Sequence, residues 1–282
     1  MKEPSPSVAV VTDSTADIPT AEAEALHITV VPAIITIEGK TYVDDGKEIT
    51  REEFYRLMPT MSEPPTTAVP SSLAFEKVYQ RLLDEGYQRI LSIHVSGRLS
   101  GMINSANQAA QIFGDQIHIF DSGQFTLALG FQVMEAASAA LAGMSFESVV
   151  ETTRDAQDKV RLIALIDSME YLKRSGRVSW LRAGLGDLLN VKLLVNVSDG
   201  IIEKIGLCRT RRKGIDQLDS LARSWGPLKR MAVLHSNLPD EAAMLAEQLR
   251  NLSSTPPLIV DITTVIGIHV GPNSIGLVGL CK

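Results

Sequence analysis

Short apolar runs rich in β-branched residues alternate with helical patterns through the first half of the chain. In order, these segments are SVAVVT, PTAEAEALH, ITVVPAIIT, REEFYRLM, RILSIHVS, NSANQAAQIF and IHIF. Thr50 and Glu53 form a capping box at one helix start. Apolar positions repeat at helical spacing from Phe75 to Leu83, and Gly86 follows as a stop. Strands that alternate with helices predict an α/β domain with a mainly parallel sheet flanked by helices.

The pattern changes from RLIALID onward, where strand-like runs follow one another more closely. VKLLVNVSDGIIEKIGL predicts a hairpin that turns at residues 198–200. RMAVLHS, a helix from Asp240 to Leu252, LIVDITTV and IGLVGL come next. We therefore predict two domains: an N-terminal α/β domain over residues 1–160 and a C-terminal α/β domain with a mixed sheet over residues 161–282.

One segment near the C-terminus raises a question of function. IGIHVGPNSIGLVG, residues 266–279, places His269 between an apolar run and a Gly-Pro turn. The apolar run predicts a β-like segment. An ionisable ring at this position favours either an enzyme or a carrier of a polar head group.

Composition narrows the class of protein. The chain has 282 residues, 45% of them hydrophobic, which is enough for two cores. A net charge of -6 argues against a nucleic-acid binder. The two cysteines have no CxxC spacing, and the polar N-terminus resembles no secretion signal, so we expect a cytoplasmic protein. The stretch 126–144 is apolar but contains Gln132 and Glu135, and we expect a buried helix there and no transmembrane segment.

Motifs for nucleotides, metals and serine nucleophiles are missing from the sequence. There is no GxxxxGK[ST] loop, and GLGDLL at 184–189 does not complete GxGxxG. No HExxH occurs, the five histidines lack metal-ligand spacing, and no GxSxG elbow is present. We therefore expect no metal and no nucleotide cofactor.

Hydroxyl side chains follow the predicted strands. Thr12-Asp13-Ser14-Thr15 follows the first strand, SGRLSG (96–101) follows another, and PPTTAVPSS precedes a helix. Ligands of open α/β sheets bind beyond the carboxyl ends of the strands, where hydroxyls can donate to a carboxylate or phosphate. The same residue types are ordinary helix caps, and each one alone is best interpreted as a cap. Basic residues gather in the second half, either as a docking face or as solvated side chains.

Six segments together resemble the DegV family along nearly the whole chain: VVTDSTADIP, PTTAVPS, SGRLSG followed by NSA, YLKRSGRVS, VKLLVNVSDG and IGIHVGPNSIG. The resemblance implies a two-domain α/β protein that holds one long-chain fatty acid, such as palmitate or a related C16–C18 chain, between or beside its domains. It also implies a carrier without catalytic residues of its own. Such proteins present the fatty acid to a separate ATP-binding fatty acid kinase, which makes the acyl phosphate. Transient membrane contact fits this role.

The resemblance also implies the site residues. The family's carboxylate-binding threonine matches Thr67, although Ala68 and Val69 replace the serine and glutamine that usually follow. The family's serine turn matches Ser100, with Ser96 second, and the family's histidine matches His269. We expect support for the head group or the backbone from Thr66, Gly97, Gly101, Asp13, Ser14 and Gly271. The kinase is expected to dock on Arg174, Arg177, Arg209 and Arg211.

Two other functions stay open. A serine-dependent acyl hydrolase or acyltransferase would use Ser96 or Ser100 as nucleophile, His269 as base, and Asp13 or Asp121 to orient the base. A free-standing phosphotransferase lacks a recognisable nucleotide loop.

Overall fold

The chain folds into two compact units. The computed structural model describes residues 7–178 and 191–282. One unit comprises the chain up to Ile34 and Ala68–Lys159, and the other comprises Ile35–Thr67 and Val160–Lys282. A single boundary near residue 160 therefore does not account for residues 35–67, which belong to the second unit. This segment is bound there by contacts remote in sequence, including the Tyr55 hydroxyl, which donates to the Ile262 carbonyl at 3.1 Å.

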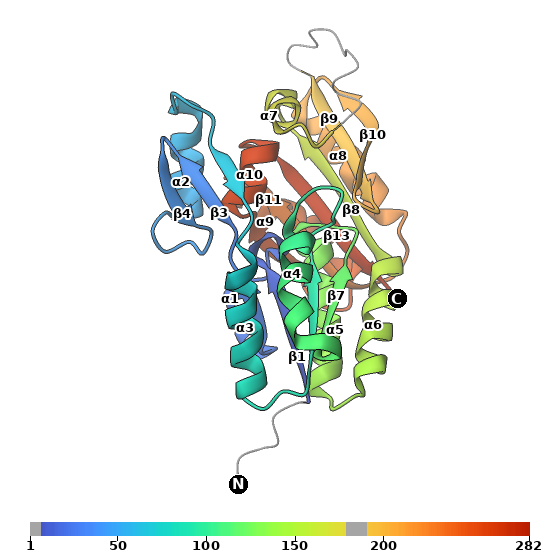
Figure 1. Ribbon diagram of the computed structural model, residues 1–282. Helices are drawn as coiled ribbons and strands as arrows, with labels where there is room; N and C mark the ends of the chain where they lie inside the picture. The colour runs from blue at the N-terminus through green and yellow to red at the C-terminus, as the bar shows by residue number, and fades with distance from the viewer. Residues whose placement is uncertain (1–6, 179–190) are drawn as a thin grey trace. The chain divides into compact units, whose positions relative to one another are not determined.

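The first unit contains a parallel four-stranded sheet in the order β2-β1-β6-β7. Its helices α3 and α4 lie side by side, and α5 packs against α6 (Figure 1). The predicted α/β class is confirmed for this unit. Its elements are β1 (Val8–Asp13), η1 (Ser14–Ala16), α1 (Thr20–Ala25), β2 (Ile28–Val31), α3 (Ser72–Asp84), β6 (Arg89–His94), α4 (Met102–Ala110), η3 (Gln111–Gln116), β7 (Ile117–Asp121), α5 (Thr126–Leu141) and α6 (Phe146–Lys159).

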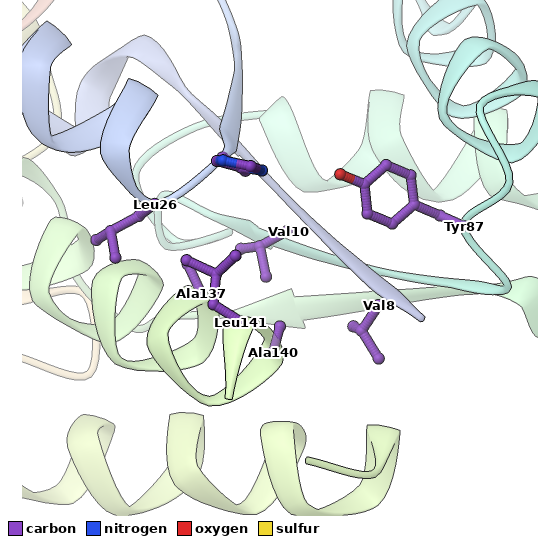
Figure 2. Close-up of a pocket in the computed structure, with 8 residues that line it drawn as sticks. Val8, Val10, Leu26, Tyr87, Ala137, Ala140 and Leu141 are labelled. Atoms are coloured by element: carbon purple, nitrogen blue, oxygen red, sulfur yellow. The ribbon is translucent and has the colours of Figure 1, made fainter. Parts of the chain in front are cut away.

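Strand register decides which side chains share a face of this sheet. Val11 of β1 pairs with Ser92 of β6, so Asp13 and His94, two residues further on, point to the same face. Val8 and Val10 point to the opposite face, where Figure 2 shows them beside α5 in a small pocket that Tyr87 also lines. This pocket lies at the start of β1, at the far end of the strand from the hydroxyl-rich turns.

Helix α5 is buried along almost its whole length, as the sequence predicts for the stretch 126–144. Gln132 is fully buried and its amide donates to the Ser122 and Ala128 carbonyls, both at 3.1 Å. Among the described residues, no helix is both long and apolar enough to cross a membrane.

The second unit has a six-stranded mixed sheet in the order β10-β9-β8-β13-β11-β12, in which only β11 and β12 are parallel. A three-stranded sheet has the order β4-β3-β5. Side chains of α8 and α9, such as Leu218 and Leu245, join the core on the six-stranded sheet. The elements are β3 (Ile34–Ile37), β4 (Lys40–Val43), α2 (Arg51–Leu57), η2 (Met58–Thr60), β5 (Thr66–Ala68), β8 (Val160–Ile166), α7 (Met169–Ser175), β9 (Lys192–Ser198), β10 (Ile201–Cys208), α8 (Arg211–Arg223), β11 (Leu228–His235), α9 (Pro239–Leu249), η5 (Arg250–Leu252), β12 (Leu258–Asp261), α10 (Thr264–Val270) and β13 (Ile275–Cys281).

The predicted hairpin between β9 and β10 is confirmed. Asp199 and Gly200 occupy its two turn positions with φ of 49° and 70°. Positive φ at both central residues defines the type I′ turn, whose twist matches that of the paired strands.

The prediction of a β-like segment around His269 is wrong. Residues Thr264–Val270 form helix α10, and the strand begins only at Ile275. Every residue of α10 except His269 is buried, so the segment has no polar face and no helical period in its sequence. Its β-branched residues favour a strand by intrinsic preference, and tertiary packing overrides that preference.

Candidate functional site

Thr67 and His269 meet in the second unit. Thr67 lies on β5, an edge strand of the three-stranded sheet, and His269 lies in the last turn of α10. The Thr67 Oγ1 and His269 Nε2 atoms are 3.4 Å apart, a long hydrogen bond between residues 202 positions apart in the sequence. Two residues that the sequence predicts for one ligand are therefore brought together by the fold.

Two tyrosines hold the helix that carries His269. A Cβ atom on Gly267 would lie 2.5 Å from the Tyr55 hydroxyl, and one on Gly271 would lie 2.3 Å from Cδ2 of Tyr171. Gly271 also has φ of 76°, a conformation that side chains disfavour. The tyrosine rings thus fill the places of absent side chains on either side of His269. Sequence reasoning found Gly271 but missed both tyrosines, because the glycines do not reveal which residue packs on them.

His269 is neutral in this environment. Burial, with the nearby Arg177 charge adding to it, lowers the pKa of His269 to about 4. Its Nδ1 atom is buried and has no hydrogen-bond partner within the described part of the chain. A buried polar atom without a partner is costly unless a ligand or water satisfies it.

Ser236 holds the turn that follows His269. Its buried hydroxyl donates to the Gly271 carbonyl at 2.9 Å and accepts from the Ser274 amide at 2.8 Å. Arg211 donates to the Asn273 carbonyl at 2.7 Å. The turn is therefore fixed on both sides. Ser236 follows strand β11, a signal that the sequence analysis did not use.

In the first unit, the turn SGRLSG connects β6 to α4. The Ser96 hydroxyl accepts from the Arg98 amide at 3.3 Å, and the Ser100 hydroxyl accepts from the Met102 amide at 3.2 Å. Ser96 and Ser100 are joined directly, because the Ser100 amide donates to the Ser96 carbonyl at 3.1 Å.

Two glycines shape this turn. The Gly97 amide donates to Asp121 at 3.1 Å, and a Cβ on Gly97 would lie 3.2 Å from the same carboxylate oxygen. Gly101 is the N-cap residue of α4. Gly97 therefore allows a close approach to Asp121.

Three further predicted residues have other surroundings. The Asp13 carboxylate accepts from Thr15 and from His94, and the Ser14 hydroxyl accepts from the Ala33 amide at 3.0 Å. Both residues are buried and support the local backbone. Thr66 is exposed, next to Thr67 on β5.

The carboxylates of the alternative hydrolase are already engaged. Asp13 accepts from His94 at 2.9 Å, and Asp121 accepts from Gly97 and Gly123 at 3.1 and 2.9 Å. Since His94 pairs with Asp13, the geometry gives no support to a triad built on His269. Within the described residues, no group of three His, Cys, Asp or Glu side chains could hold a metal ion.

The predicted basic cluster divides into two kinds of residue. Arg174, Arg177 and Arg209 are exposed, and Arg174 pairs with Glu170 at 2.5 Å. Arg211 instead bonds Glu241 through Nε at 2.7 Å and also contacts Asp167 at 3.3 Å. Its charge is balanced inside the unit, and this distinguishes Arg211 from the three exposed arginines as a candidate for docking. Arg182, another basic residue of this half, lies outside the described residues.

The fold and the site define a class: a two-unit α/β protein with a histidine–threonine pair and hydroxyl-rich turns. Residues 7–281 match the family model DegV, whose description is "Uncharacterised protein, DegV family". The DegV domain-containing protein of Streptomyces coelicolor is 33% identical over 277 residues, covering 96% of this chain and 97% of that protein. The chain belongs to the DegV family.

Solved structures agree with this assignment. A fatty-acid-binding DegV family protein from Thermus thermophilus is 31% identical with a TM-score of 0.90, covering 98% of this chain and 99% of that one. DegV of Bacillus subtilis, a fatty acid binding protein, is 32% identical with a TM-score of 0.85 and the same coverage. The fold expected from the resemblance is confirmed.

Proposed function

We propose that this protein binds one long-chain fatty acid and presents its carboxylate to a separate fatty acid kinase, with no covalent chemistry of its own. The fatty-acid-binding relatives support the ligand class. The observation that carries the proposal is the contact between Thr67 and a neutral, partly buried His269.

Donor counting explains why this pair suits a carboxylate. Neutral imidazole has one N–H and one acceptor nitrogen. If Thr67 donates to Nε2, the proton sits on Nδ1 and that N–H is free for a ligand. If Nε2 donates to Thr67, the threonine hydroxyl is free instead. In either tautomer the pair offers one donor to a carboxylate oxygen, which needs such donors when it is buried.

One donor does not satisfy a carboxylate, and we propose the Ser96 and Ser100 hydroxyls of the first unit as further donors to the lipid. The acyl chain supplies most of the affinity, because burying about fifteen methylenes contributes on the order of 10 kcal/mol before the entropy losses of binding.

Native mass spectrometry of the purified protein, followed by lipid extraction, tests the ligand class. A retained fatty acid at one per chain supports the proposal and identifies the acyl chain. A protein that is empty and also fails to bind added palmitate would refute it.

Two valine substitutions test the head-group contact. Thr67→Val removes the hydroxyl at nearly constant shape, and we expect palmitate affinity in calorimetry to fall about tenfold, the effect of one hydrogen bond to a charged group. Thr41→Val, at an exposed position on β4 of the same small sheet, is the matched control and should leave affinity unchanged. Equal affinities for the two variants would exclude Thr67 as a contact.

For the partner, we propose a docking face that includes Arg174, Arg177 and Arg209. Arg209→Glu should abolish ATP-dependent acyl phosphate formation by the kinase while palmitate binding stays normal, since charge reversal acts mainly on association. Arg154→Glu, an exposed reversal in the first unit, is the control. Unchanged turnover with Arg209→Glu would show that this arginine is only solvated.

A further inference from the structure

Four buried polar side chains form a hydrogen-bonded series inside the first unit. The Tyr79 hydroxyl lies 2.9 Å from Ser92 Oγ, Ser92 Oγ lies 2.7 Å from His94 Nε2, and His94 Nδ1 lies 2.9 Å from Asp13 Oδ2. All four residues are 0% exposed. The series runs from α3 through β6 to the end of β1.

The direction of each hydrogen bond in this series follows from its last member. A carboxylate only accepts, so His94 donates from Nδ1 to Asp13. In the tautomer with its single proton on Nδ1, the imidazole accepts at Nε2, so Ser92 donates to His94. The Ser92 oxygen is left to accept from Tyr79. Every donor points toward Asp13, an arrangement in which the bonds polarise one another.

The order serine, histidine, aspartate resembles a hydrolase triad, but it has no route to a substrate. Ser92 is fully buried, and its hydroxyl already accepts a hydrogen bond from Tyr79 and donates its own proton to His94. The series therefore serves to orient a side chain, and the side chain at its end is Asp13.

Asp13 joins two loops at the carboxyl edge of the sheet. Its Oδ1 accepts from the Thr15 amide at 3.1 Å and from the Thr15 hydroxyl. Its Oδ2 accepts from His94 and from the Val95 amide at 3.2 Å. Val95 directly precedes Ser96, so the carboxylate fixes the residue just before the SGRLSG turn.

We propose that His94 and Asp13 are positioning residues for the Ser96–Gly101 turn, and that His94 acts by holding the Asp13 carboxylate against the Val95 amide. The inference rests on the proposed function, in which the hydroxyls of this turn contact the fatty acid. Four donors face Asp13, and an amide in its place would direct N–H groups against some of them.

The test compares palmitate affinity with stability in four variants of the full-length protein. Asp13→Asn should weaken palmitate binding at least tenfold. Thr153→Val is the matched control, because it removes a buried hydroxyl of the same unit that donates to the Val149 carbonyl at 2.8 Å. It should lower the melting temperature while changing affinity less than twofold. Equal affinities for these two variants would overturn the proposal.

Two substitutions of His94 separate positioning from general destabilisation. Asn places an amide near the position of Nδ1 and can still donate to Asp13, whereas Gln places its amide near the position of Nε2. We expect His94→Asn to bind palmitate at least fivefold more tightly than His94→Gln. This comparison decides the matter if Asp13→Asn does not fold, and equal affinities would overturn the proposal. If the unmodified protein itself fails to bind palmitate, the result would refute the proposed function instead.

Discussion

Because His269 is neutral in the folded protein, we expect the free energy of unfolding to fall in acid. The substitution His269→Gln should remove this part of the loss. The pKa of His269 is lowered to about 4 in the folded protein, whereas a histidine in an unfolded chain has a pKa near 6.5. Between these values the unfolded chain binds more protons than the native state. The free energy of unfolding that depends on neutral His269 is therefore fully present above about pH 6.5 and is lost as pH falls toward 4.

The size of the effect follows from the same two pKa values. Linkage between about pH 7 and pH 5 gives a loss of about 2 kcal/mol from this residue. A native pKa one unit higher would still leave more than about 1 kcal/mol, because pH 5 lies well below the unfolded value. The prediction is thus large compared with the error of a denaturation experiment.

Urea denaturation of the wild-type protein and of His269→Gln, in steps from about pH 7 to pH 5, measures the loss. The wild type should lose about 2 kcal/mol more than the variant over this range. His118, whose pKa is also lowered, chiefly by burial, is present in both proteins and cancels in the difference. Parallel stability profiles would refute the reasoning, and so would a His269 imidazole that titrates near 6.5 by NMR.

Two further predictions concern residues around the site. Gly271→Ala should cost at least 2 kcal/mol more than Gly143→Ala in urea denaturation: both glycines have φ near 75°, but only a Cβ on Gly271 would meet a side chain, Tyr171. Equal costs would show that backbone conformation alone matters. Arg211→Met should cost about 1–2 kcal/mol because it removes the cation paired with Glu241 and one of the two cations paired with Asp167 in a partly exposed site, whereas the exposed Arg212→Met should change stability by less than about 0.5 kcal/mol. Equal losses of unfolding free energy in Arg211→Met and Arg212→Met would contradict this prediction.

Local signals in the sequence predicted local structure well. Thr50 caps α2 by accepting from the Glu53 amide at 3.1 Å, and Gly86, with φ of 101°, lies just past the end of α3. Such features depend on neighbouring residues only, so composition and spacing reveal them. The parallel sheet was predicted from the alternation of strands and helices along the chain, because parallel neighbours need a crossover between them.

Remote contacts were not predictable in this way. Residues 35–67 join the second unit because Tyr55 and Asp44 bond residues more than 200 positions later. Helix α10 is stabilised by burial against α2 and α7, and its own sequence favours a strand. The Thr67 to His269 contact was expected only through the family resemblance, since nothing in either segment alone indicates the other.

The hydroxyl-rich turns also show why a choice between helix cap and ligand donor is incomplete. A serine that caps a helix accepts a hydrogen bond through a lone pair, and its O–H proton is not used. Ser100 precedes the N-cap Gly101 and accepts from the Met102 amide through a lone pair in the same way, so this bond orients the hydroxyl without consuming its ability to donate. Asp13 and Asp121 make similar bonds but have no proton to give an anion. At the carboxyl edge of the first sheet, the carboxylates are therefore suited to hold the backbone and the serines to contact a carboxylate, and Ser100→Asp should preserve the bond from the Met102 amide while abolishing palmitate binding.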